Sequence, residues 1–216
     1  MLSDYPLVTH SVTCAGRTWE LSCVTDQDAL IRPLQTDEDL ANFPFGILLW
    51  ASAHALALRL AEEPALVKGK RILEIGAGVG YVGLVAAHLG AAQVVQTDYH
   101  EDCLALCREN ATRNQIANLT VQKGDWRSWP KDLTSFDLVF GADVLYERLL
   151  HPTLTDLLPT LGTKILLADP IWPAALEFIE TRERAGWKLQ MEAKRLEWAG
   201  EWRDTMLLWI TPTPSR

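Results

Sequence analysis

The sequence predicts an α/β fold in which a mostly parallel sheet is covered by helices on both faces and ends in an antiparallel hairpin. Three observations support this prediction. From residue 71 onward, short apolar runs alternate with amphipathic segments, a pattern typical of βα units. The apolar runs are nearly continuous, as expected for parallel strands that are buried on both faces. The last two apolar runs lie on either side of a turn that contains Gly200.

An N-terminal extension, residues 1–42, precedes these units. Residues 7–14 and 18–24 predict two strands that are joined at Ala15-Gly16 and form a small β-hairpin. Residues 25–42 are polar and acidic, and they predict a loop with a short helical turn. An apolar segment then leads into a helix that extends to about residue 60 and is apolar almost all round, so we expect it to pack on the sheet.

The remaining chain, residues 43–212, is expected to form one domain, followed by a frayed polar tail at residues 213–216. The predicted strands are 71–75, 93–97, 119–123, 136–140 and 164–168, the predicted helices are 79–89, 101–114, 147–160 and 174–185, and the terminal hairpin takes 187–193 and 204–210.

Composition limits the classes of function. The chain of 216 residues has a net charge of −8, which argues against binding to nucleic acid or to an anionic membrane surface. The most apolar stretch, residues 43–61, is interrupted by Pro44, Gly46 and Arg59, so it is not expected to span a membrane. No secretory signal pattern or metal-ligand spacing is evident. We therefore expect a cytoplasmic, monomeric protein without a metal.

A glycine-rich loop is the strongest functional signal. The apolar run that ends at Ile75 is followed by glycines at alternate positions and then by an amphipathic segment, which predicts a strand, a tight turn and a helix start. Glycine allows positive φ values and a close approach of the backbone to a ligand. We expect the N–H groups of this loop to face an anionic or electron-rich group. The glycines are Gly76, Gly78 and Gly80.

The spacing of this loop distinguishes two nucleotide-type ligands. The dinucleotide fingerprint requires a glycine at the sixth position from Gly76, where this chain has Tyr81. The pattern here is instead E-x-G-x-G-x-G and begins at Glu74, which resembles motif I of class I S-adenosylmethionine (AdoMet)-dependent methyltransferases. This resemblance implies a Rossmann-like, doubly wound, mostly parallel seven-stranded sheet. A glycine-rich turn that binds nothing is the alternative.

Two further candidate sites follow the next strands, because ligands of open α/β sheets bind at the carboxyl ends of strands. Asp98 follows the second strand and is suited to accept hydrogen bonds from both hydroxyls of a ribose, although it could also cap the following helix. After the third strand, Asp125 is suited to bind the exocyclic amine of an adenine and Trp126 to flank the ring. A turn aspartate beside a core tryptophan is the alternative.

The segment after the fourth strand narrows the choice among methyltransferase families. Asp143 and Tyr146 form a D-x-x-Y tetrad, and Leu48-Leu49-Trp50 lies upstream of the glycine loop. Together with the Asp-Trp pair, these features resemble the family 16 methyltransferases, many of which methylate protein lysines. The resemblance assigns Glu74, Gly76, Ala77, Gly78 and Gly80 to the methionine end and ribose of AdoMet, Asp98 with Tyr99 to the ribose region, Asp125 and Trp126 to the adenine, Trp50 and Ala142 to the cofactor wall, and Asp143 and Tyr146 to the reacting nucleophile.

One departure leaves the methyl acceptor open. Several relatives carry an arginine after Asp-Pro in the segment that follows the fifth strand, whereas this chain has Trp172 there. The indole of Trp172 either forms the floor of a substrate pocket or belongs to the core. We expect an AdoMet-dependent N-methyltransferase that acts on a protein lysine. The alternatives are a methyltransferase of small amines, a catalytically idle binding module and, least favoured, a dinucleotide oxidoreductase.

Overall fold

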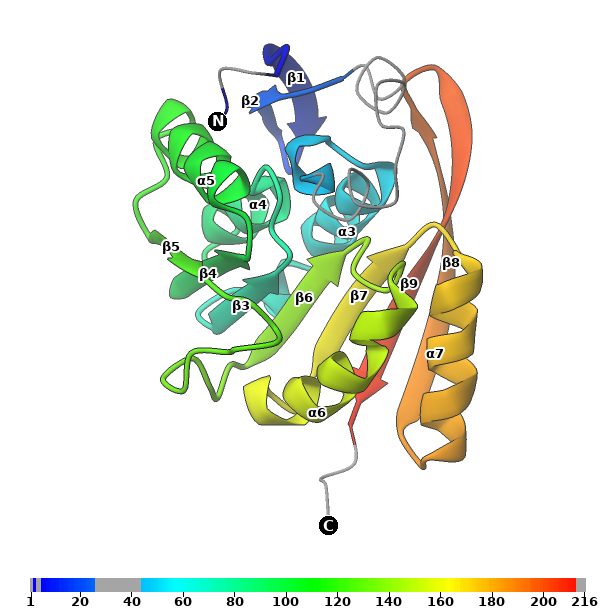
Figure 1. Ribbon diagram of the computed structural model, residues 1–216. Helices are drawn as coiled ribbons and strands as arrows, with labels where there is room; N and C mark the ends of the chain where they lie inside the picture. Colours follow the sequence, from blue (N-terminus) through cyan, green and yellow to red (C-terminus); the bar gives the residue numbers. More distant parts are fainter. Residues whose placement is uncertain (1, 3–4, 26–43, 213–216) are drawn as a thin grey trace.

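The computed structural model describes residue 2 and residues 5–25 and 44–212 (Figure 1). A seven-stranded sheet forms its centre, and this confirms the predicted fold class. Within this sheet, the five strands that come first in the chain are parallel to one another. The strand that comes last in the chain is antiparallel to both of its neighbours. In spatial order the strands are β5 (Leu119–Lys123), β4 (Gln93–Asp98), β3 (Arg71–Ile75), β6 (Leu138–Ala142), β7 (Ile165–Asp169), β9 (Glu201–Thr211) and β8 (Lys188–Trp198).

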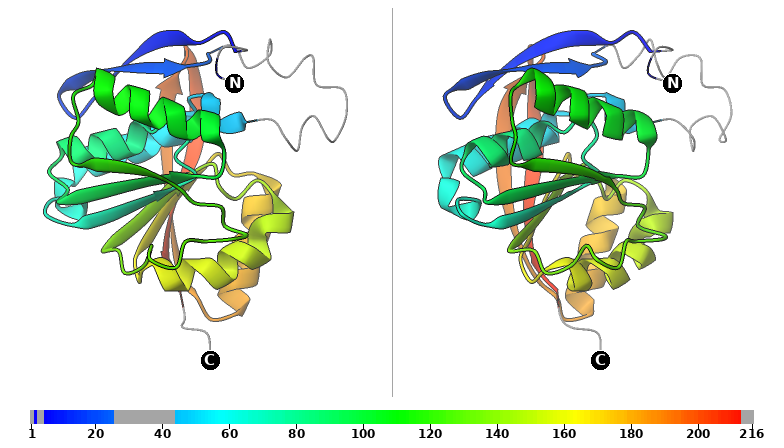
Figure 2. Two further views of the ribbon diagram at one scale, coloured as in Figure 1. Left: turned by 60° about the vertical axis from the view of Figure 1, so that its left-hand side comes forward. Right: turned by 90° about the vertical axis from the view of Figure 1, so that its left-hand side faces the viewer.

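Helices cover both faces of the sheet, as the buried strands require. Figure 2 shows α4 and α5 on one face and α6 and α7 on the other. The face of α4 and α5 also receives α3, which follows the short 3₁₀ turn η2 (Phe45–Ile47). The helices are α3 (Ala51–Glu62), α4 (Tyr81–His88), α5 (Glu101–Arg113), α6 (His151–Leu161) and α7 (Pro173–Arg184), with further 3₁₀ turns η3 (Pro64–Leu66) and η4 (Arg148–Leu150).

The fourth parallel strand begins two residues later than residues 136–140 predict. The Asp137 carboxylate accepts a hydrogen bond from the backbone N–H of Arg71 (2.8 Å), and Phe136 N–H bonds to Leu161 O (2.8 Å) outside the strand. Pairing with β3 therefore starts at Leu138. This shift makes Asp143 the first residue after the strand, at the edge where ligands bind.

Two helix starts also differ from the prediction. The helix expected at 79–89 begins at Tyr81, because Gly80 is its N-cap and has the left-handed φ of 80°. The helix expected at 147–160 is preceded by η4 and begins at His151. Pro152 stands in its first turn, where the lack of an N–H costs nothing.

The C-terminal hairpin is longer than predicted, with eleven residues in each strand. Ala199 and Gly200 form its turn with φ values of 51° and 79°, the left-handed pair that suits a two-residue hairpin. The extra length brings Trp198 to the N-terminal hairpin, β1 (Val8–Cys14) and β2 (Arg17–Cys23). The Trp198 ring lies 6.2 Å from His10 and 5.1 Å from His54, centroid to centroid.

The N-terminal hairpin packs on the outer side of α5 (Figure 2). The Asn110 side chain makes two hydrogen bonds to the backbone of β2. Its Oδ1 accepts from Ser22 N–H (2.7 Å) and its Nδ2 donates to Ser22 O (3.1 Å). Asn114 makes the same pair with Glu20, at 3.1 and 2.8 Å. The predicted loop at 25–42, apart from residue 25, and the tail at 213–216 lie outside the described residues.

Candidate functional site

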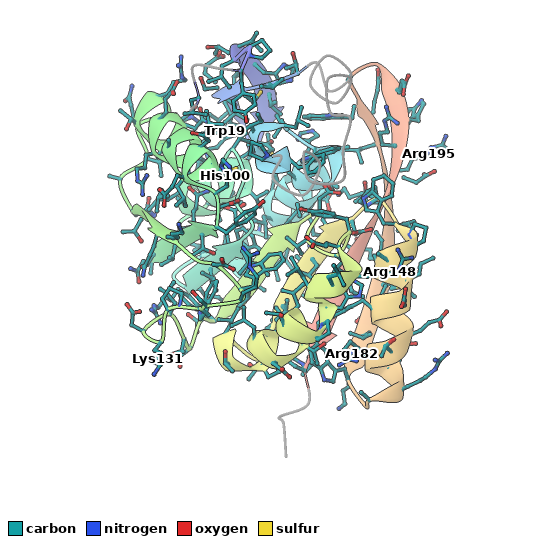
Figure 3. All side chains as sticks on the ribbon, viewed as in Figure 1. Trp19, His100, Lys131, Arg148, Arg182 and Arg195 are labelled. Atoms are coloured by element: carbon teal, nitrogen blue, oxygen red, sulfur yellow. The ribbon has the colours of Figure 1, made fainter. Side chains whose placement is uncertain are left out.

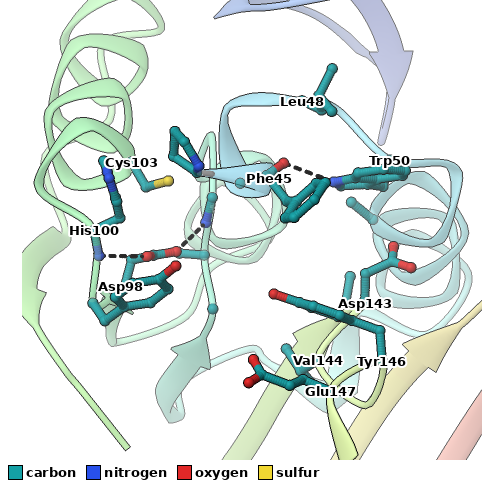
Figure 4. A pocket seen from close by; sticks show the side chains of 18 of the residues that line it. Phe45, Leu48, Trp50, Asp98, His100, Cys103, Asp143, Val144, Tyr146 and Glu147 are labelled. Carbon is teal, nitrogen blue, oxygen red and sulfur yellow. Dashed lines mark hydrogen bonds between the residues drawn. The ribbon is translucent and has the colours of Figure 1, made fainter. Parts of the chain in front are cut away.

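A cavity of about 970 Å³ opens at the carboxyl edge of the sheet, where the strand order reverses between β3 and β6 (Figure 4). Its walls come from the ends of four parallel strands. Phe45 and Trp50 of segment 44–50 lie across from Tyr146 of the tetrad that follows β6 (Figure 4). Gly80, a predicted site residue, does not line this cavity. The other predicted site residues do: Trp50, Glu74, Gly76, Ala77, Gly78, Asp98, Tyr99, Asp125, Trp126, Ala142, Asp143 and Tyr146.

The glycine loop has the conformation that its sequence predicts. Gly76, Gly78 and Gly80 have φ values of 60°, 56° and 80°. The expectation that the loop N–H groups face a ligand is wrong at three positions, however. Ala77 N–H bonds to Thr97 O (2.9 Å), Gly78 N–H to Asp98 Oδ2 (3.0 Å) and Gly80 N–H to Ala77 O (2.8 Å). These groups hold the turn together, so they are not available to a phosphate.

Segment 44–50 lies directly against this loop. A Cβ added to Gly78 would stand 2.7 Å from Gly46 O, so the two backbones touch at a distance that excludes any side chain. Trp50 Nε1 donates to Phe45 O (3.1 Å) and holds the segment folded over the cavity (Figure 4). Gly46 and Phe45 are thus site residues that the sequence reasoning missed. The sequence there shows an apolar run with a glycine, a pattern that predicts only the approach to a helix.

Glu74 is buried at the junction of β3, β4 and α4. Its Oε2 accepts from Gly83 N–H (3.0 Å) and from Gln96 Nε2 (2.6 Å). Burial raises the pKa of Glu74 to about 8, although these two hydrogen bonds oppose the shift. A Cβ on Gly83 would stand 2.5 Å from Glu74 Oε2, which explains a glycine inside the first turn of α4.

Asp98 lies at the end of β4 and is 6% exposed. Its Oδ2 accepts from Gly78 N–H and its Oδ1 from His100 N–H (2.9 Å), which leaves lone pairs on both oxygens for ligand hydroxyls. Burial raises the pKa of Asp98, against the effect of these bonds. The cap of α5 is His100, whose ring accepts from Asp102 N–H (3.2 Å). Asp98 is therefore not needed as the N-cap.

Asp125 is already paired. Its oxygens accept from Arg127 Nε (2.8 Å) and Nη2 (2.9 Å), and these hydrogen bonds lower its pKa. The neighbouring Trp126 is half-buried, packs partly on the core and, like Tyr99, lines the cavity. Aromatic surface is thus present where the resemblance places the adenine, whereas the carboxylate of Asp125 has a protein partner.

Asp143 follows β6 with a φ of 53°, in the left-handed region that residues with a Cβ seldom adopt. Its Oδ2 accepts a hydrogen bond from the buried hydroxyl of Ser52 on α3. Burial, followed by the charge of Asp169, raises the pKa of Asp143 to about 8. Tyr146 is 45% exposed and contacts Phe45 edge-on, with centroids 6.3 Å apart.

Three tryptophans in the C-terminal part of the chain have different positions. Trp172 lines the cavity and is 46% exposed, so it is not a core residue. Trp198 packs in the hairpin against His54, and Trp202 is exposed on the same hairpin. Neither of them lines the cavity. Within the described ranges, no group of three or more His, Cys, Asp or Glu side chains is arranged to hold a metal ion.

The cavity has the chemistry expected for AdoMet. Its volume is at the upper end of the range for small-molecule sites. AdoMet contains no phosphate, which agrees with a glycine loop whose N–H groups bond internally. A dinucleotide would need those groups for its pyrophosphate. A buried carboxylate at Asp98 suits the ribose hydroxyls, and Tyr99 and Trp126 offer aromatic surface to a base.

Comparisons with known proteins agree with this geometry. The chain is 36% identical over 137 residues to protein N-lysine methyltransferase METTL21A of Mus musculus, covering 60% of each chain. It is 34% identical over 108 residues to histone-arginine methyltransferase METTL23 of Mus musculus, covering 48% of this chain and 42% of the relative. The chain thus spans less than two thirds of the length of these relatives.

The fold is also found in solved structures. Magnesium protoporphyrin IX methyltransferase (ChlM) of Synechocystis PCC 6803, solved with bound SAH, superposes with a TM-score of 0.56 at 15% identity, covering 75% of this chain and 82% of that chain. None of the described helices has the length and apolar character needed to cross a bilayer. Residues 30–169 match the family described as lysine methyltransferase, and the chain therefore belongs to that family.

Proposed function

We propose that this protein is an AdoMet-dependent N-methyltransferase whose acceptor is a protein lysine. The observation that carries this proposal is a single continuous cavity with two chemically different ends. One end holds the glycine loop, Asp98 and the aromatic pair Tyr99 and Trp126. The other end holds Asp143 and the partly exposed Tyr146 (Figure 4).

Each end has a distinct task. Asp98 accepts hydrogen bonds from the ribose hydroxyls, and Tyr99 and Trp126 cover the base. When bound, AdoMet supplies a methyl group on a positively charged sulfur, and its transfer depends mainly on proximity and alignment. A lysine side chain arrives as ammonium at neutral pH and must lose a proton before its nitrogen can react. Asp143 and Tyr146 are placed to receive that side chain.

The acceptor class rests on the family and on charge. A net charge of −8 favours a basic or neutral protein acceptor over nucleic acid. The likeness to METTL23 makes arginine the second candidate, and a small amine is the third. We further propose that the enzyme acts as a monomer in the cytoplasm.

Calorimetric titration with AdoMet, S-adenosylhomocysteine and NAD tests the cofactor. We expect the first two to bind and NAD to be silent. Binding of NAD alone would overturn the proposal, and silence from all three would leave an idle module.

Radiolabelled methyl transfer to lysate proteins and to small amines then tests the acceptor. Acid hydrolysis should release labelled methyl-lysine, and labelled methyl-arginine would instead support the second candidate. Asp143→Asn should abolish transfer and leave AdoMet affinity within about threefold. Asp132→Asn, which removes a distant exposed carboxylate, is the matched control.

A further inference from the structure

Two carboxyl groups lie on adjacent strand ends, one in the tetrad and one next to it. Asp143 directly follows β6 and Asp169 ends β7, and these strands pair in parallel with Ala142 opposite Ala168. The backbone N–H of Asp143 bonds to Ala168 O (2.8 Å), which fixes the two residues side by side. Asp143 lines the cavity, whereas Asp169 does not, so Asp169 stands behind it.

Asp169 is 1% exposed and its carboxylate is only half satisfied. Its Oδ1 accepts from Trp172 N–H (2.9 Å), but its Oδ2 has no hydrogen-bond partner among the described residues. None of the ion pairs between described residues involves Asp143 or Asp169. Like charges this deep, without a paired cation, are unfavourable unless one of them carries a proton or a cationic ligand enters.

The surrounding groups offset the charge of this pair only in part. Tyr146 from the tetrad and His151 from α6 are the titratable groups that face it, Tyr146 toward Asp143 and His151 toward Asp169. His151 Nε2 is engaged with Leu145 O at 3.0 Å. The remaining contacts to Asp143 are hydrogen bonds from the Ser52 hydroxyl and the Trp172 side chain. Arg148, labelled in Figure 3, forms its ion pair with Glu177.

We propose that Asp143 takes the proton from the acceptor ammonium, and that Asp169 is the positioning residue whose buried charge adds to the effect of burial in making Asp143 a strong enough base. This inference rests on the proposed function. In the step, a proton moves from the ammonium to the Asp143 carboxylate. The amine nitrogen then bonds to the methyl carbon while the carbon–sulfur bond breaks, and its electron pair stays on sulfur as a neutral thioether. The proton on Asp143 leaves to water.

The magnitudes favour a base of this kind. The pKa of a free aspartate lies about 6.5 units below that of a free lysine, so an ordinary carboxylate is a poor acceptor for an ammonium proton. With the pKa of Asp143 at about 8, the difference shrinks to about 2.4 units. The strained backbone agrees with a built site, since Asp143 (φ 53°) and the β-branched Ile171 (φ 67°) both lie in the left-handed region.

Carboxyl ¹³C NMR titration of the full chain, labelled at aspartate, tests the inference. Asp169→Asn retains an oxygen for Trp172 N–H but removes the charge, so the turn should persist. We expect the pKa of Asp143 to fall by about 1 unit or more in this variant. Asp132→Asn, in the distant loop that also holds Lys131 (Figure 3), should leave it unchanged. An Asp143 that titrates near pH 4 in the native chain, or is indifferent to Asp169→Asn, would overturn the inference.

A reciprocal variant covers the case in which Asp169→Asn does not fold. Because Asp169 ionises while Asp143 is still protonated, the neutral Asp143→Asn variant should leave the pKa of Asp169 close to its value in the native chain, and a clear fall there would mean that Asp143 ionises first and would contradict the inference. This titration needs neither acceptor nor methyl transfer. If the titration shows that the two carboxyl groups interact but the protein transfers no methyl group, the result would contradict the proposed function and leave the interaction of Asp143 with Asp169 intact. With an acceptor in hand, Asp169→Asn should move the acid limb of kcat to lower pH while AdoMet affinity stays constant.

Discussion

At the scale of single residues, Glu74 contributes a pH dependence to the stability of the fold. Below about pH 4 the side chain is protonated in both the folded and the unfolded chain, so it has no effect on the slope. Between its unfolded pKa near 4.5 and its folded pKa of about 8, only the unfolded chain loses the proton. Over that window Glu74 lowers the free energy of unfolding by about 1.4 kcal/mol per pH unit, and the loss levels off above it.

Glu74→Gln should remove this slope. The amide oxygen can still accept from Gly83 N–H, so the junction of β3, β4 and α4 should persist. Urea unfolding at pH 5, 6.5 and 8 should show the variant gaining stability relative to the native chain as pH rises. Asp125→Asn is the control, because Asp125 has a lowered pKa and stays ionised throughout this window. Parallel curves for native chain and Glu74→Gln would show that Glu74 is ionised in the folded protein.

At the scale of elements, the glycine loop and segment 44–50 act as one unit. Gly78→Ala combines a positive φ with a Cβ 2.7 Å from Gly46 O, so segment 44–50 must move away from the cavity. We expect AdoMet affinity to fall more than about tenfold, together with a loss of stability of about 2 kcal/mol. Calorimetry and urea unfolding measure the two effects.

Gly16→Ala is the control that separates the effect of a strained backbone φ from the effect of a steric clash of the added Cβ. Gly16 has a φ of 71°, but a Cβ there meets no atom within 4 Å. This variant should lose about 1 kcal/mol of stability and keep its AdoMet affinity. Equal AdoMet affinity in Gly78→Ala and Gly16→Ala would mean that segment 44–50 does not shape the site.

At the scale of the whole molecule, Asn110 connects the N-terminal hairpin to the cofactor loop. Its Nδ2 donates both to Ser22 O and to Val79 O (2.9 Å), whereas Asn114 contacts the hairpin but not the loop. Asn110→Ala should therefore lower both stability, by about 1–3 kcal/mol, and AdoMet affinity. Asn114→Ala should lower stability alone. If both variants bind AdoMet as the native chain does, the hairpin is energetically separate from the site.

The sequence predicted the layers of this fold well, because strand burial and helix periodicity are local properties. Asp143 and Tyr146 were assigned to the site through the resemblance of their tetrad to that of the family. The sequence could not show that Asp169 stands behind Asp143, since their proximity arises from the pairing of β6 with β7. Nor could it show that Arg127 donates hydrogen bonds to the Asp125 carboxylate, or that the N–H groups of the glycine loop are hydrogen-bonded within the protein. Both depend on side-chain and turn geometry.

The order of strands has a consequence for synthesis on the ribosome. In the sheet β8 pairs only with β9, and β9 also covers β7. A nascent chain that has reached Trp198 thus holds every strand that bounds the ligand cavity, but its β7 edge, buried at all positions in the finished protein, lacks a partner. Such an edge is a template for aggregation. We therefore expect premature termination before residue 201 to yield insoluble protein rather than a weak enzyme.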